Sequence, residues 1–75
     1  MTYARREEIF SKDVITTKEL QELLGYSDES GASRKMQEIK RVVGDKLGVK
    51  GKIHTADYFR FFEIQTERYS KLIND

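Results

Sequence analysis

Residues 16–25 read Thr-Thr-Lys-Glu-Leu-Gln-Glu-Leu-Leu-Gly, and this stretch decides the fold. Thr16 followed three residues later by Glu19 is the pattern of a capping box, in which each side chain accepts a hydrogen bond from the other residue's backbone amide. Three leucines follow at helical spacing, and Gly25 suits the left-handed conformation that closes many helices. The stretch therefore predicts a helix over residues 17–24.

A turn and a longer helix are expected next. Residues 26–31 (Tyr-Ser-Asp-Glu-Ser-Gly) have the composition of a turn, and Ser27 or Ser30 is expected to cap the helix that follows. Beyond the turn, apolar residues recur at intervals of four, three, four and four, which predicts an amphipathic helix over residues 32–47. Its inward stripe consists of Ala32, Met36, Ile39, Val43 and Leu47.

Basic charge collects on the outward arc of this second helix and on the segment after it. Residues 31–52 carry seven basic and two acidic side chains, a net charge of +5, whereas residues 1–30 carry −3 and residues 53–75 carry −1. The total of +1 therefore conceals a polarised chain. Positive charge concentrated on one ordered element is typical of a protein that binds a polyanion, because each neutralised phosphate releases counterions.

Shorter elements are expected on either side. Residues 3–10 predict a first helix with Ile9 and Phe10 facing inward, and the pair after it, Val14 and Ile15, is expected to be extended. Residues 48–53 are expected to form a small wing, either a tight hairpin or a loop. In this wing Val49 and Ile53 are expected to point inward and Lys50 and Lys52 outward.

The last helix is expected to begin with Thr55 as its cap. Its inward stripe is predicted to comprise Tyr58, Phe59 and Phe62, continued by Tyr69 and by Leu72 or Ile73. Phe61 and Ile64 fall off this stripe. We expect these two side chains either to cover the first helix or to leave an apolar surface for a partner.

Size and composition point to one domain over residues 1–75. A chain of this length buries only about 60% of the surface that it exposes when unfolded, so one core is the limit. The chain has no cysteine, hence no disulfide, and local helical packing must hold it together. With the elements above, we expect a mainly α fold, a compact three-to-four-helix domain with a short β wing.

The predicted order of elements resembles the helix-turn-helix domains of small bacterial and phage regulators. Residues 16–27 look like the first helix and turn of that motif in excisionase-like and MerR-like winged domains. The segment Ile53-His54-Thr55-Ala56-Asp57-Tyr58 opens much like the helix that follows the wing in those domains. The likeness covers about residues 14–64, and it implies double-stranded DNA as the partner.

If the basic helix enters a major groove, its N-terminal half should meet base edges. Arg34 and Gln37 are then the candidates for reading sequence, since arginine pairs with guanine and glutamine with adenine. Ser33 is expected to hold a phosphate. The remaining expected contacts follow the DNA backbone without reading sequence: Lys40, Arg41 and Lys46 on the helix, with Lys50 and Lys52 on the wing.

Several function classes lack a supporting pattern. His54 is the only histidine, so neither a metal site nor a catalytic base has the necessary partners, and we read this residue as the junction between wing and helix. The glycines match no phosphate-loop or dinucleotide spacing. We expect no enzyme activity, no cofactor and no small-molecule substrate. The longest apolar runs are two residues, so no membrane segment is expected and a cytoplasmic location follows.

Three functions stay open. The first is sequence-specific DNA binding by a phage or mobile-element protein, acting as a transcriptional regulator or as an excisionase-type recombination directionality factor. The second is a protein-interaction module, such as a phage inhibitor or antirepressor, which would use the acidic ends or the Phe61 and Ile64 surface, in a homodimer or against a protein partner. The third is RNA binding, for which the aromatic side chains look too buried to serve as stacking platforms.

Overall fold

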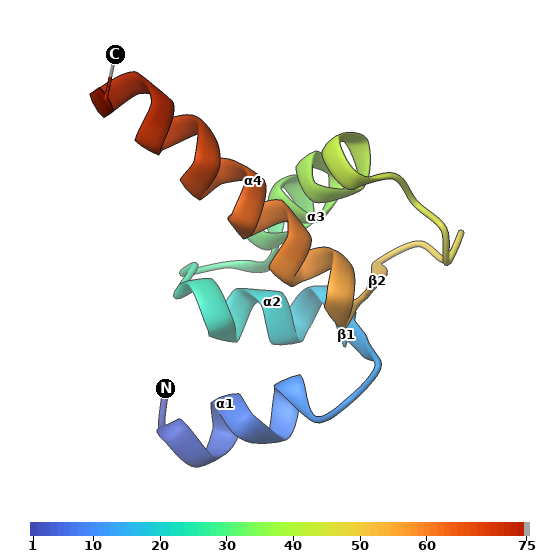
Figure 1. The fold of residues 1–75 in the computed structure, drawn as a ribbon. Helices are drawn as coiled ribbons and strands as arrows, with labels where there is room; N and C mark the ends of the chain where they lie inside the picture. Colours follow the sequence, from blue (N-terminus) through green and yellow to red (C-terminus); the bar gives the residue numbers. More distant parts are fainter. Residues whose placement is uncertain (75) are drawn as a thin grey trace.

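The computed structural model describes residues 1–74, with four helices and a two-stranded antiparallel sheet in that part of the chain (Figure 1). The expected fold class, a mainly helical domain with a small β element, is confirmed. The elements in chain order are α1 (Tyr3–Phe10), β1 (Val14–Thr16), α2 (Thr17–Leu24), α3 (Glu29–Val43), β2 (Lys52–His54) and α4 (Thr55–Asn74).

Helices α1 and α2 lie where the sequence predicts them. The Thr16 hydroxyl accepts a hydrogen bond from the Glu19 amide at 3.2 Å, and the Glu19 carboxylate accepts one from the Thr16 amide at 3.0 Å. Gly25 ends α2 with a φ of 71°, in the left-handed region. These predictions are confirmed because the interactions that decide them span only three or four residues.

Helix α3 begins at Glu29, earlier than predicted. Its N-cap is Asp28, whose carboxylate accepts a hydrogen bond from the Gly31 amide at 3.1 Å. The expected caps, Ser27 or Ser30, were therefore wrong, and the Ser30 hydroxyl instead donates to the Asp28 carboxylate at 2.8 Å. The connection between α2 and α3 shortens to residues 25–28, a length typical of a helix-turn-helix.

Helix α3 also ends earlier than predicted, at Val43. Gly44 has a φ of 90° and a ψ of 153°, a conformation that glycine adopts readily and that stops the helix. The predicted helix over residues 32–47 was therefore wrong at both ends. Lys46 and Leu47 lie in the loop after α3, so their predicted helical positions were wrong as well.

The small sheet joins two segments that are distant in sequence. Ile15 of β1 pairs with Ile53 of β2 in an antiparallel register, and both side chains are buried. The wing is therefore a loop over residues 44–51 that returns into β2, the second of the two expected forms. Ile53 points inward as predicted, whereas the prediction for Val49 was wrong, because 42% of its surface is exposed.

The start of α4 is tied to the link between α1 and β1. Helix α4 begins at Thr55 as expected, but the Thr55 hydroxyl donates to the carbonyl oxygen of Lys12. The Thr55 amide donates to the carbonyl oxygen of Asp13 at 2.8 Å. Thr55 is thus the first residue of α4 and not its cap, so that prediction was wrong, and its hydroxyl instead holds α4 against the segment that leads into β1.

The core side of α4 differs from the predicted stripe. Phe61 has no exposed surface and is the largest fully buried side chain, so it is not part of a partner surface and that prediction was wrong. Phe59, predicted to face inward, is 49% exposed and lies against the ring of Phe10. Compared with the prediction, α4 is rotated about its axis, because it packs on α3 through Phe61. The Lys35 ammonium of α3 lies 5.5 Å from the Phe61 ring centre.

The second half of α4 projects away from the other helices (Figure 1). Residues 65–72 are all exposed, so the predictions that Tyr69 and Leu72 face the core were wrong. The side chain of Ile73 lies outside the part of the chain whose side chains are described. The core itself occupies the space enclosed by the four helices and the sheet: Ile9, Ile15, Leu20, Leu23, Met36, Ile39, Ile53, Tyr58 and Phe61.

Candidate nucleic-acid interface

Three of the predicted contact residues share one exposed face of α3. Arg34, Gln37 and Arg41 follow at intervals of three and four along the helix, and all three side chains are exposed. They lie opposite the buried stripe that begins at Ala32. Within residues 1–74, none of the three side chains forms a hydrogen bond or an ion pair. Two unpaired guanidinium groups and an amide are therefore presented together to solvent.

A groove of about 270 Å³ lies beside this face, between α3, the start of α2 and the loop. The structure brings four of the eight predicted DNA contacts to this groove. Its polar and charged lining includes Ser33, Gln37, Lys40 and Lys50, and Glu29 adds one carboxylate. Ser33 is half-buried here, while Gln37 and Lys50 are exposed.

Lys40 differs from the other predicted phosphate contacts. Its ammonium donates to the carbonyl oxygen of Val49 at 2.8 Å and lies 3.4 Å from a carboxylate oxygen of Asp45. The side chain is only 16% exposed. The Lys40 charge is therefore already engaged by the loop that follows α3.

The loop over residues 44–51 is held by a hydrogen bond within it and by hydrogen bonds to α2 at its end. Near its start, the Asp45 carboxylate accepts a hydrogen bond from the Gly48 amide at 3.0 Å. Near its end, the Gly51 carbonyl oxygen accepts from the Thr17 amide at 3.0 Å and from the Thr17 hydroxyl at 3.2 Å. The Asp45 contact closes a turn within the loop, and the Thr17 contacts fix the end of the loop against α2, next to Lys50 at the groove.

Two of the predicted contacts lie away from the groove. Lys46 lines a separate hollow, which Asp13, His54 and Asp57 also line. Lys52 is exposed on β2 and pairs with Thr16 in the sheet register, next to the first residue of α2. The structure thus groups Lys50 with the α3 face and leaves Lys46 elsewhere.

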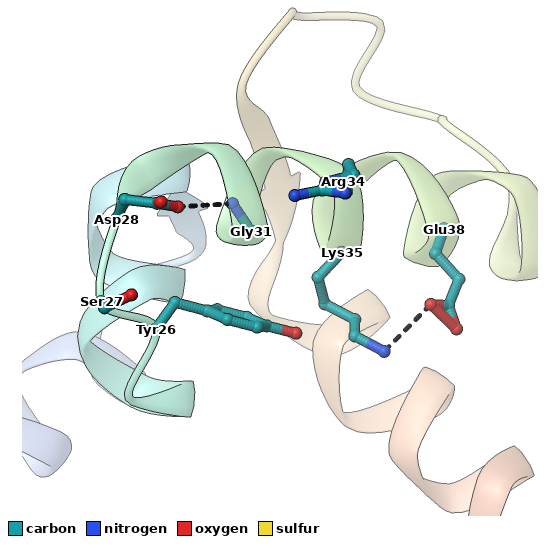
Figure 2. A pocket seen from close by; sticks show the side chains of 7 residues that line it. All are labelled: Tyr26, Ser27, Asp28, Gly31, Arg34, Lys35 and Glu38. Atoms are coloured by element: carbon teal, nitrogen blue, oxygen red, sulfur yellow. Dashed lines mark hydrogen bonds and ion pairs between the residues drawn. The ribbon is translucent and has the colours of Figure 1, made fainter.

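The first turn of α3 is acidic. Hydrogen bonds from the Gly31 amide and then the Ser30 hydroxyl lower the pKa of Asp28 below its ordinary value of 3.8, so this carboxylate stays charged at neutral pH. Figure 2 shows the ring of Tyr26 lying beside Gly31 at this end of the helix, with Arg34 one turn further along. Positive charge on α3 therefore begins at Arg34.

Several residues of the site were not predicted from the sequence. Asp28, Thr17 and Asp45 position the site through their hydrogen bonds to the backbone. Asp45 followed three residues later by Gly48 is a known turn pattern, which was the available signal for that residue. No comparable signal links Thr17 to Gly51, because the contact depends on the tertiary fold.

No protein-family model, curated protein or solved structure matches this chain. Within residues 1–74, no helix combines the length and the apolar character needed to cross a bilayer. His54 lies at the end of β2, directly before α4, which is the junction that the sequence predicted for it.

Proposed function

We propose that this protein binds double-stranded DNA through α3 and reads sequence with its exposed face. The observation that carries the proposal is the grouping of Arg34, Gln37 and Arg41 on one side of α3, free of partners in the described chain. A helix presented after a short turn is the element that enters the major groove in helix-turn-helix proteins.

The roles follow from side-chain chemistry. Arg34 suits a bidentate pair with guanine and Gln37 one with adenine, while Arg41 and Lys50 would hold backbone phosphates. Asp28 and the adjacent Glu29 would repel phosphates, so the middle of α3 is the part that approaches the DNA. The biological role that we infer is a transcriptional regulator or a recombination directionality factor of a phage or mobile element.

The proposal is tested with single arginine variants. R34A and R41A should each weaken binding to a duplex selected from a random pool by about tenfold or more, since each removes a charged contact. R68A is the matched control, because Arg68 is exposed on the projecting half of α4 and has no place in the interface. Equal affinities for R34A, R41A and R68A would contradict the assignment of α3.

A second candidate is a protein-interaction module, and the exposed apolar side chains of α4 favour it. The exposed apolar side chains of α4 are those of Phe59, Tyr69 and Leu72. They differ from the surface predicted from the sequence, because Phe61 is buried and Ile64 is half-buried. In that case the wild-type protein would bind no duplex at low salt and would bind a protein partner instead. F59A would then weaken that protein contact while leaving the fold intact.

A further inference from the structure

We infer that Lys40 and Asp45 form a latch that positions the loop over residues 44–51 for DNA, so that Lys40 acts through the loop instead of through a phosphate. The inference rests on the proposed function. It assigns a positioning role to one predicted contact, and it gives an acidic residue a part in binding a polyanion.

The contacts of the latch join α3 to both halves of the loop. The Lys40 ammonium reaches the Val49 carbonyl oxygen at 2.8 Å and the Asp45 carboxylate at 3.4 Å. The other Asp45 oxygen accepts from the Gly48 amide at 3.0 Å. One lysine of the helix thus holds the residue directly before Lys50, and one aspartate holds the turn that precedes it.

The loop needs such contacts because its own backbone is permissive. Gly44, Gly48 and Gly51 all have positive φ, and glycine loses more conformational freedom on ordering than other residues. The Val49 side chain is 42% exposed and is not part of the core cluster. Without the latch, the loop would keep the Thr17 contacts at Gly51 and the hydrogen bond from the Lys52 amide to the Val49 carbonyl oxygen at 3.3 Å, but nothing in residues 1–74 would tie its middle to α3 by a side-chain hydrogen bond or ion pair. A loop that is ordered before binding avoids that entropy loss when DNA arrives.

Asp45 gives the sharpest test because two accounts predict opposite signs. If Asp45 only adds negative charge near the interface, D45A should tighten DNA binding by removing a repulsion. If it belongs to the latch, D45A should weaken binding, because a mobile Lys50 loses its phosphate contact. One lost contact costs roughly tenfold in affinity at about 0.1 M salt and lowers the salt slope by about 0.9.

Glu38 supplies the matched control. It is also a carboxylate of this region held by a lysine of α3, since the Lys35 ammonium lies 2.9 Å from it, but it has no contact with the loop. E38A should therefore bind the duplex as tightly as wild type or tighter. Weaker binding by D45A together with unchanged or tighter binding by E38A supports the latch, and tighter binding by both overturns it.

A double-variant cycle separates the latch from a direct phosphate contact. K40M should weaken binding in the wild-type background and have little further effect in the K50A background, because both changes remove the same contact. Additive losses from K40M and K50A would overturn the proposal. The fold of each variant is checked by its thermal unfolding.

The latch also has a signature that needs no DNA. In K40M and D45A, nitrogen relaxation of the amides of residues 46–50 should report larger fast motion than in wild type, while E38A should not change it. Unchanged relaxation in K40M and D45A would overturn the latch. Absence of any duplex binding by the wild-type protein would instead contradict the proposed function, so the two failures are distinguishable.

Discussion

At the scale of single residues, Phe61 is the buried side chain through which α4 packs against α3. It has no exposed surface, its ring meets that of Phe62 edge to face with 5.1 Å between the centres, and the Lys35 ammonium lies over it. The spacing of apolar residues along α4 placed Phe59 inward instead. Four aromatic residues within five positions leave the inward side ambiguous, and only the packing on α3 resolves it.

Paired truncations of these aromatic residues test that assignment. F61A should lower the free energy of unfolding by about 3–5 kcal/mol, because it leaves a cavity in the core. F59A should cost clearly less, because its side chain is half exposed already. Urea denaturation of the two variants provides the comparison, and equal losses would show that the rotation of α4 is misassigned.

Glu19 is a buried carboxylate whose charge is stabilised locally. Burial acts to raise its pKa, but hydrogen bonds from the Lys12 ammonium and the Thr16 amide outweigh it, so the pKa is lowered from 4.5. The Lys12 nitrogen lies 2.7 Å from the carboxylate. The folded protein therefore holds its Glu19 proton more weakly than the unfolded chain does.

This sign gives a prediction for acid stability. The Glu19 contribution is complete above pH 4.5 and is lost as the pH falls through the lowered value in the folded protein. E19Q should lower the free energy of unfolding by about 1 kcal/mol at neutral pH. Below pH 4.5, the free energy of unfolding of E19Q should fall less steeply with decreasing pH than that of wild type. E67Q, at an exposed site, is the control. Identical pH profiles for E19Q and wild type would contradict the role of Glu19.

At the scale of elements, Gly44 decides where α3 ends. As an interior helical position it would favour alanine, since alanine has the higher helix propensity. In the structure it has a φ of 90° and an extended ψ, a region that only glycine occupies without strain. Helix propensity alone therefore predicts that G44A stabilises the protein, whereas the backbone conformation in the structure predicts that it destabilises the protein.

G44A is the variant that distinguishes these two expectations. It should destabilise the protein by about 1–3 kcal/mol, because alanine is strained in this backbone conformation. The measurement is the midpoint of thermal or urea unfolding against wild type. A stabilised G44A protein would indicate that α3 continues through this residue as the apolar periodicity suggested.

Local signals predicted the elements well, and tertiary contacts account for the rest. The capping box at Thr16 and the stop at Gly25 were predicted because neighbouring residues decide them. The pairing of β2 with β1 was not, because Ile15 and Ile53 meet only when the helices have packed. The candidate site shows the same division. The periodicity of α3 predicted which side chains face outward, but it could not predict that the loop binds Lys40, because that contact depends on the tertiary fold.

At the scale of the whole molecule, charge is segregated within a small fold. The +5 segment contains α3 from Gly31 onward, the loop and the start of β2. The −3 segment contains α1, β1, α2 and the first two residues of α3. Some acidic side chains of the −3 segment form ion pairs within the protein, as Glu8 does with Arg5 at 2.8 Å. The basic face of α3 keeps Arg34 and Arg41 unpaired within residues 1–74.

The most direct test of the account is the binding of wild-type protein to a labelled duplex pool at several salt concentrations. If Arg34, Arg41 and Lys50 contact phosphates or bases, binding should weaken steeply with salt, with a logarithmic slope near −0.9 for each phosphate neutralised. The R34A/R41A double variant should show a shallower slope and at least about tenfold lower affinity. The absence of salt-dependent duplex binding by the wild type would contradict the account.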